Sequence, residues 1–262
     1  GYDLTVVGLP KTIDNDVYPI HQTMGADTAA EQGAIFFENI VNENTTSRRQ
    51  LIIHEVMGRN CGWLTAATAK YYRDRLTKRT FYDSNGLYRD RWDIHAVYVP
   101  EIEIDIDYES SRLNEIMNRF DCVNIFLSEG AGINNILNDL ESSGNKIDRD
   151  AFGHVRLDDI NPGQWYAKKI SQWTNAKKVL VQKSGYFARS SAPNKTDLDL
   201  IEKTAKKAVK YALQKQSGVA ALRDSTNRIE CIDFTEIKGE KPFDFNQEWF
   251  DSMLTEIGQK KR

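Results

Sequence analysis

The sequence predicts an α/β fold with a largely parallel sheet, and two observations support this prediction. Short apolar runs of strand length alternate along the chain with longer segments in which apolar residues recur at helical spacing. Groups of charged residues, glycines and prolines directly follow several strands, at the position where open α/β sheets bind their ligands.

The first elements are two strands and two helices. Residues 4–8 (LTVVG) form a short apolar run that predicts a buried strand. From 23 to 41 apolar and small residues recur at helical spacing, and Asn-Glu-Asn at 42–44 ends the pattern. The run QLIIHEV at 50–56 predicts a strand with a buried centre, and the alanine-rich segment 61–72 predicts a helix.

A polar stretch separates these elements from the middle of the chain. Residues 73–93 are highly charged and contain an Asn-Gly turn at 85–86, which predicts a surface hairpin or an insertion. A strand at 96–100, a helix at 110–120 and a strand at 122–128 (CVNIFLS) are predicted to follow.

The last part of the chain repeats the alternation. A proline in the first turn opens a helix over 161–173, and KVLVQ at 178–182 predicts a strand. The helix predicted at 196–216 carries acidic residues early and lysines late, as the helix dipole favours. A short strand at 218–222 and a helix at 247–257 complete the predicted order.

The composition is that of a globular protein with small-molecule ligands. The chain has 262 residues, of which 40% are hydrophobic and 28% charged, and a formal net charge of -3, so neither nucleic acid nor membrane is an expected partner. No apolar run reaches the ~18 residues that a membrane span needs. Three distant cysteines fit neither a disulfide framework nor a zinc site, and we expect a cytoplasmic protein.

The start of the chain suggests that the sequence is truncated. The strand predicted at 4–8 has almost nothing before it, and the chain lacks an initiator methionine. A central strand rarely opens a protein. We therefore expect that a segment upstream of residue 1 is missing.

Four polar clusters follow four of the predicted strands and share one chemistry. They are PKTIDND at 10–16, MGR at 57–59, EGAG at 129–132 and KSGYFAR at 183–189. Arginine and lysine bind phosphate oxygens, and two aspartates one residue apart suit a proton acceptor and a Mg²⁺ neighbour. Glycines let backbone N–H groups approach a phosphate, and a glutamate can accept hydrogen bonds from sugar hydroxyls. Each cluster alone could be an ordinary turn or corner, but chance would seldom place all four at strand ends.

These clusters resemble the signatures of the phosphofructokinase family. The resemblance lies in PKTIDND at 10–16, EVMGR at 55–59, SEG at 128–130 and GYFAR at 185–189, and it runs in order over nearly the whole chain. It implies a fold of two lobes with largely parallel sheets, without the N-terminal part of the donor-binding lobe and its glycine-rich loop. Residues 1–26 would end the donor-binding lobe, 27–190 would bind fructose 6-phosphate, and 191–262 would return to the donor lobe.

The resemblance also implies roles for individual residues. Asp14 would accept the proton of the sugar 1-hydroxyl. Asp16 would lie beside Mg²⁺ and the moving phosphoryl group, and Thr12 would help to orient that group. Lys11 and Arg59 would act with these aspartates on the moving phosphoryl group. The residues expected to hold fructose 6-phosphate and the transition state are Met57, Gly58, Arg59, Glu129, Tyr186 and Arg189.

The resemblance leaves the phosphoryl donor between pyrophosphate and ATP. Lys11 replaces a glycine of many ATP-dependent members and is similar to a lysine that reaches the donor in pyrophosphate-dependent ones, although some long ATP-dependent members also carry it. Tyr186 stands where many bacterial ATP-dependent enzymes have histidine, and 71–95 is longer than in short members. We favour pyrophosphate. A non-catalytic regulatory subunit is a further alternative, against which intact Asp14, Asp16 and Arg59 argue.

Family members form homo-oligomers, and we expect a dimer or tetramer here. Many members lend an arginine to the neighbouring subunit from the position of Gln50, which Arg49 could replace. A second lent arginine would fall near Leu180, where Lys178 and Lys183 are both candidates.

Overall fold

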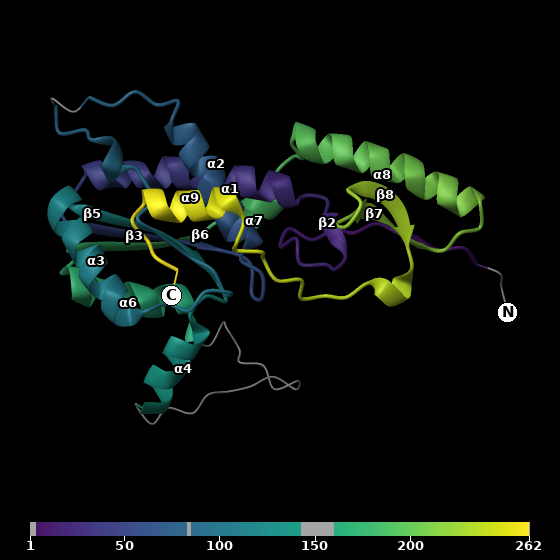
Figure 1. The fold of residues 1–262 in the computed structure, drawn as a ribbon. Coiled ribbons are helices and arrows are strands. Elements are labelled where there is room, and N and C mark those ends of the chain that lie inside the picture. Colours follow the sequence, from purple (N-terminus) through teal and green to yellow (C-terminus); the bar gives the residue numbers. More distant parts are fainter. Residues whose placement is uncertain (1–3, 83–84, 143–159, 262) are drawn as a thin grey trace.

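The computed structural model describes residues 4–82, 85–142 and 160–261, and it confirms the α/β fold (Figure 1). The larger of its two sheets is wholly parallel, with the strand order β4-β5-β3-β6. Its strands are β3 (Gln50–Val56), β4 (Ala96–Tyr98), β5 (Cys122–Ser128) and β6 (Lys178–Lys183). Every residue of β3 and β5 is buried, as expected for central strands of a parallel sheet that is covered on both faces.

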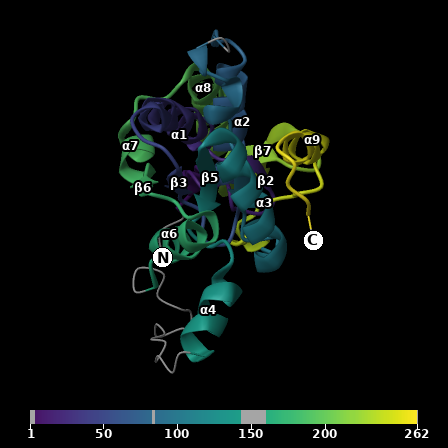
Figure 2. The ribbon, with the colours of Figure 1, turned by 90° about the vertical axis from the view of Figure 1, so that its left-hand side faces the viewer.

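Helices cover both faces of the larger sheet. On one face lie α1 (Ala26–Ile40), α2 (Trp63–Leu76) and α9 (Glu248–Glu256). On the other lie α3 (Ile106–Phe120) and α6 (Pro162–Thr174), with α4 (Ile133–Ser142) beside α6 (Figures 1 and 2). Strand β3 alternates between the two cores, because Ile52 packs with the first group, whereas Leu51 and Ile53 pack with the second. No helix in the described part of the chain is long and apolar enough to cross a membrane.

The smaller sheet contains β1 (Val7–Gly8), β2 (Ile20–Gln22), β7 (Gly218–Arg223) and β8 (Arg228–Ile232). Only the pairing of β1 with β7 is parallel, since β2 and β8 both run antiparallel to β7. This sheet therefore departs from the expectation of largely parallel sheets in both lobes. A short hairpin joins β7 directly to β8, and such a connection can only give antiparallel strands. Helix α8 (Lys195–Leu213) packs against this sheet (Figure 1).

The structure corrects several sequence-based predictions. The apolar segment at 4–8 is not a buried strand, because only its last two residues pair, with β7, and Leu4 is 75% exposed. Helix α2 extends to Leu76 and takes up the start of the predicted surface segment 73–93. The polar cluster GYFAR at 185–189, for which no helix was predicted, forms the short helix α7 (Gly185–Ser190). Helix α9 packs beside the larger sheet, and the assignment of 191–262 to the donor lobe stays a prediction. Strands β2 and β8 and helix α4 were not predicted.

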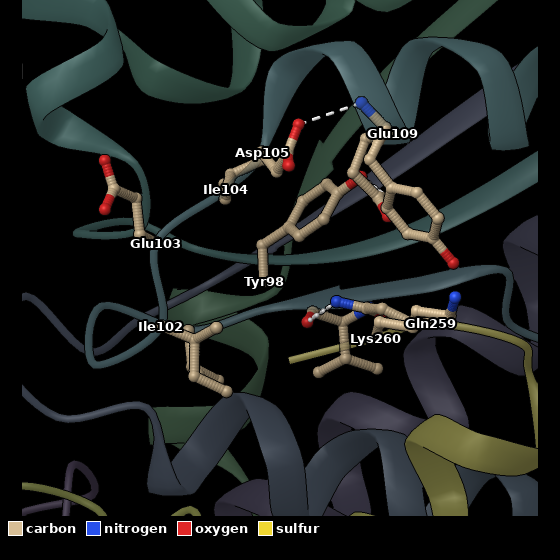
Figure 3. A pocket seen from close by; sticks show the side chains of 11 residues that line it. Tyr98, Ile102, Glu103, Ile104, Asp105, Glu109, Gln259 and Lys260 are labelled. Atoms are coloured by element: carbon tan, nitrogen blue, oxygen red, sulfur yellow. Dashed lines mark hydrogen bonds between the residues drawn. The ribbon is translucent and has the colours of Figure 1, made fainter. Parts of the chain in front are cut away.

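The side chain of Gln259 covers the edge of the larger sheet (Figure 3). The backbone N–H of Val97 in β4 donates to its Oε1 at 2.8 Å, and its Nε2 donates to the carbonyl of Val97 at 2.9 Å. The amide thus replaces a neighbouring strand at an edge that would otherwise be open. The cleft beside it has a volume of about 10 Å³, room for about one water, so we assign it no ligand.

A buried carboxylate connects α8 of the smaller sheet to α1 of the larger one. Asp197 has no exposed surface, and its Oδ1 accepts a hydrogen bond from the Gly25 N–H at 2.9 Å. Its Oδ2 accepts from the Thr28 N–H at 2.7 Å and from the Thr28 hydroxyl at 2.5 Å. Asp197 therefore caps the first turn of α1 from another helix, satisfying amides that have no partner within α1.

We expect Asp197→Ala to destabilise the protein by about 2–4 kcal/mol, because it leaves buried amides without an acceptor. Urea unfolding would measure the loss as a lower midpoint at unchanged slope. The matched control is Asp199→Ala, exposed on the same helix, which should change stability by less than about 0.5 kcal/mol. Equal effects of the two substitutions would contradict the capping role.

Candidate active site

One cavity lies at the carboxyl ends of β3 and β5 in the larger sheet. Its volume is about 580 Å³. Its walls come from the ends of β3 and β5, the start of α6, the turn from β6 into α7, and the turn after β1. The lining residues are Asp14, Glu55, Val56, Met57, Arg59, Glu129, Pro162, Lys183, Gly185, Tyr186 and Arg189. All four polar clusters of the sequence thus contribute to a single site.

The structure brings six of the predicted site residues into this cavity, namely Asp14, Met57, Arg59, Glu129, Tyr186 and Arg189. The other four lie outside its lining. Thr12 and Asp16 adjoin Asp14, because the Thr12 hydroxyl accepts a hydrogen bond from the Asp14 N–H at 3.2 Å and donates to Asp16 Oδ1 at 3.5 Å. Gly58 is buried and Lys11 is exposed, and neither lines the cavity.

Asn15 holds the turn that carries the two aspartates. It is 2% exposed and adopts a left-handed backbone conformation (φ 55°), which asparagine tolerates better than most residues. Its Oδ1 accepts from the Thr23 N–H at 2.9 Å, and its Nδ2 donates to the carbonyl of His21 at 3.2 Å. The Thr23 hydroxyl in turn donates to the carbonyl of Thr12 at 2.7 Å. These bonds fasten the turn to the segment that leads into α1.

Asp14 has the electrostatics of a proton acceptor at neutral pH. Burial raises the pKa of its carboxyl group from the usual 3.8 to about 6, and the negative charges of Asp16 and Glu129 add to the increase. The guanidinium of Arg189 acts in the opposite direction and lowers the pKa. Asp14 Oδ1 is buried without a hydrogen-bond partner among the described residues, so the oxygen is available to a ligand.

The turn after β3 depends on a glycine. Gly58 has φ 127°, and a Cβ atom at this position would lie 2.4 Å from the carbonyl oxygen of Cys61. The Ser128 hydroxyl at the end of β5 donates to the carbonyl of Gly58 at 2.5 Å and so joins the two strand ends. Beyond β5, burial raises the pKa of Glu129, while Arg59 and the Gly58 N–H lower it. Arg59 thus lies close enough to Glu129 to act on the same ligand.

Helix α7 presents Tyr186 and Arg189 to the cavity. It begins after Ser184, which is buried and lies 2.8 Å from His54 through its Oγ and the ring Nε2. Burial lowers the pKa of His54 to about 3, so the ring is neutral and belongs to the core. Tyr186 is 89% exposed and Arg189 is exposed as well, and both are therefore open to a ligand.

No role in the site was predicted for Glu55 from the sequence, and Lys183 was considered only as a candidate for lending to a neighbouring subunit. Both line the cavity, and Lys183 Nζ lies 2.7 Å from Glu55 Oε1. Lys183 therefore lines the pocket of its own chain, and its contribution to a second copy stays a prediction. The available signal for Glu55 was a charged residue near the end of an apolar strand.

The other candidates for lending lie at the opposite edge of the sheet. Arg49 precedes β3, and its guanidinium donates to the carbonyl of Asn175 at 3.1 Å and to Asn118 Oδ1 at 3.0 Å. Lys178 begins β6 and pairs with Glu43 at 2.7 Å. Their contribution to a second copy stays a prediction.

The aspartate turn fits a magnesium ion that is held mainly by a substrate. The described residues contain no group of three or more His, Cys, Asp or Glu side chains arranged to hold a metal. Mg²⁺ in phosphoryl-transfer sites usually has one or two carboxylate ligands, with waters and substrate phosphates completing its shell. Asp16 and the unpartnered Oδ1 of Asp14 match such a partial site.

Comparisons with known proteins point to one family. A family model for phosphofructokinase matches residues 1–212. The chain is 53% identical over 261 residues to the pyrophosphate–fructose 6-phosphate 1-phosphotransferase of Methylomonas methanica, and 51% identical over 262 residues to the protein of that name from Mastigamoeba balamuthi. These matches cover 99% and 100% of the chain, which spans 64% of the length of each relative.

A solved structure supports the fold independently. The pyrophosphate-dependent phosphofructokinase from Nitrosospira multiformis superposes with a TM-score of 0.67 at 17% sequence identity. The match covers 100% of this chain and 62% of the other. At this identity the likeness concerns the fold alone.

The raised pKa of Asp14 predicts a pH-dependent stability change. The folded protein retains a proton on Asp14 that the unfolded chain releases between about pH 4 and 6, so this group lowers stability as pH rises through that window. We expect Asp14→Asn to stabilise the fold by about 1–2 kcal/mol above pH 7, a value reduced for partial exposure, and by much less at pH 4.5. Thermal unfolding at both pH values measures the difference. Asp199→Asn, at an exposed site, is the control, and a stabilisation that does not depend on pH would contradict the assignment.

Proposed function

The chain belongs to the phosphofructokinase family, and from this premise we propose that it serves the transfer of a phosphoryl group from pyrophosphate to the 1-hydroxyl of fructose 6-phosphate. The products are fructose 1,6-bisphosphate and inorganic phosphate, in a reversible glycolytic step. The observation that carries the proposal is the cavity in which Asp14 faces Arg59, Arg189 and Glu129. The names of the relatives at 51% and 53% identity support pyrophosphate as the donor.

Asp14 acts as the proton acceptor. As the sugar 1-oxygen forms its bond to the donor phosphorus, its proton passes to Asp14, and the bond from that phosphorus to the bridging oxygen of pyrophosphate breaks. A pKa of about 6 keeps the carboxylate largely ionised at neutral pH while leaving it basic enough to take a proton. Thr12 and Asn15 fix the turn, so the carboxylate is positioned before the substrate arrives.

The remaining cavity residues bind the sugar and stabilise charge. Arg189 and Lys183 attract the 6-phosphate, and Arg59 stabilises the moving phosphoryl group. Glu129 accepts hydrogen bonds from sugar hydroxyls, while Met57, Gly58 and Tyr186 shape the walls. Asp16 would help to hold Mg²⁺, which supplies positive charge to the donor phosphates when bound.

The wider setting follows from the same family membership. We assign residues 1–26 to the donor lobe, 27–190 to the sugar-phosphate lobe and 191–262 to elements that return to the donor lobe. A cytoplasmic location agrees with three free cysteines, Cys61, Cys122 and Cys231. We also propose a homo-oligomer in which Arg49 or Lys178 of one copy reaches the pocket of another.

The donor is tested by turnover of the full-length enzyme with Mg-pyrophosphate and with Mg-ATP. We expect turnover with pyrophosphate and little with ATP. Lys11→Gly should cause a large loss of turnover, because the ammonium group of Lys11 acts on the donor as a point charge. Asp14→Asn serves as the inactive reference, with kcat about 10²–10⁴ lower. Turnover with ATP alone would establish the ATP-dependent alternative, and turnover with neither donor would favour a regulatory subunit.

Binding of the sugar phosphate is tested at Arg189. We expect Arg189→Ala to weaken fructose 6-phosphate binding by about 10- to 100-fold, because a charge-assisted hydrogen bond at a partly exposed site is lost. Isothermal titration calorimetry would measure the affinity. Arg228→Ala removes an exposed arginine of β8, away from the cavity lining, and should leave the affinity unchanged. Unchanged affinity of the Arg189 variant would remove this residue from the site.

A further inference from the structure

Glu55 is a charged residue in a strand that is otherwise part of the core. It lies in β3 between His54 and Val56, in a strand whose residues are all buried, and is itself 5% exposed. Burying a carboxylate costs several kcal/mol unless it is paired and hydrogen-bonded. An apolar side chain would fill the position without that cost, so the contacts of Glu55 call for an explanation.

Both oxygens of Glu55 have a defined partner at the wall of the cavity. Oε1 lies 2.7 Å from Lys183 Nζ. Oε2 accepts a hydrogen bond from the Gly163 N–H at 3.1 Å. Since Glu55 and Lys183 are direct neighbours in the parallel register of β3 and β6, their side chains leave the sheet on the same face.

The third element at this point is the start of α6. Pro162 occupies its first turn, so the Gly163 N–H is one of the helix-terminal donors without a partner inside the helix. A Cβ atom at residue 163 would lie 2.1 Å from Glu55 Oε2. The helix therefore approaches the carboxylate this closely only because residue 163 is glycine, and the positive end of its dipole favours the negative charge.

We propose that Glu55 is a positioning residue that holds the Lys183 ammonium at the cavity wall as a third cation, beside Arg59 and Arg189, for the phosphate group of the sugar. The identity of that ligand rests on the proposed function, whereas the hold on Lys183 does not. A lysine side chain has four rotatable bonds, and fixing its ammonium before binding reduces the entropy lost when the ligand arrives. Asn161 Oδ1, 3.4 Å from Lys183 Nζ, limits its position from the other side.

A competing interpretation gives the opposite sign. If Glu55 only neutralised Lys183, removing its charge would leave the pocket more positive and strengthen the binding of any phosphate. If Glu55 positions Lys183, removing its charge weakens binding of fructose 6-phosphate. The direction of the change therefore separates the two roles.

The test is a double-mutant cycle on the full-length protein, with fructose 6-phosphate and inorganic phosphate as probes in calorimetry. Glu55→Gln keeps the shape of the side chain and an acceptor for Gly163. We expect it to weaken fructose 6-phosphate binding by about 5- to 20-fold, and Lys183→Met to do the same. The double variant should bind no more weakly than Lys183→Met alone, because the two residues act as one unit.

A matched control lies away from the cavity lining. Lys169 and Asp139 form an ion pair of the same length, 2.7 Å. Asp139→Asn should leave the affinity unchanged. Tighter binding by the Glu55 variant, or additive losses in the double variant, would overturn the positioning role.

A second measurement needs no ligand, so it tests the contact between Glu55 and Lys183 even if the proposed function is wrong. The rate of acetylation of Lys183, followed by mass spectrometry in the folded protein, should rise about 3- to 10-fold in Glu55→Gln, because the ammonium loses its fixed partner. An unchanged rate would refute the hold of Glu55 on Lys183. If the wild-type protein does not bind fructose 6-phosphate, the proposed ligand is wrong, and the labelling result still decides whether Glu55 positions Lys183.

Discussion

The position of the site depends on the bonds that the buried carboxylate of Asp197 makes with the first turn of α1. Helix α1 packs on the larger sheet and α8 on the smaller one, so the contact of Asp197 with α1 fixes the two sheets relative to each other. The aspartate turn at 12–16 leads into α1 and is fastened to the same region through Asn15 and Thr23. The aspartate turn follows β1 of the smaller sheet, whereas the rest of the cavity wall belongs to the larger sheet and its helices. A shift between them would separate Asp14 from Arg189.

Three carboxylates and three cations line the cavity, and charges in and around it shift the pKa of Asp14. The carboxylates are Asp14, Glu55 and Glu129, and the cations are Arg59, Lys183 and Arg189. Arg189 lowers the pKa of Asp14, while burial, Asp16 and Glu129 raise it. A phosphate dianion bound at Arg189 would offset the positive charge and so raise the proton affinity of Asp14 when the sugar is in place. In the proposed function, binding of the sugar phosphate would therefore strengthen the base that acts on it.

The sequence predicted those parts of the fold and site that local patterns determine. Strands β3 and β5 were predicted with their observed bounds, because central parallel strands are continuous apolar runs. Strands β2 and β8 were missed, because one has only three residues and both contain charged or polar side chains. The motifs identified six residues that line the cavity, whereas Glu55 was missed and Lys183 was assigned to a different role. Their pairing depends on the register of β3 with β6, which no local pattern encodes.

The length of β3 decides which residues can serve the same pocket. The seven residues from Gln50 to Val56 span about 20 Å at ~3.3 Å per residue, which exceeds the reach of any side chain. Arg49 and Lys178 lie at the start of β3 and β6, whereas Met57 and Lys183 lie at the far ends, beside the cavity. A cation at the amino edge therefore cannot bind a sugar phosphate in its own chain. If these cations take part in the reaction, they do so in the pocket of a second copy, and the oligomer becomes a requirement for catalysis.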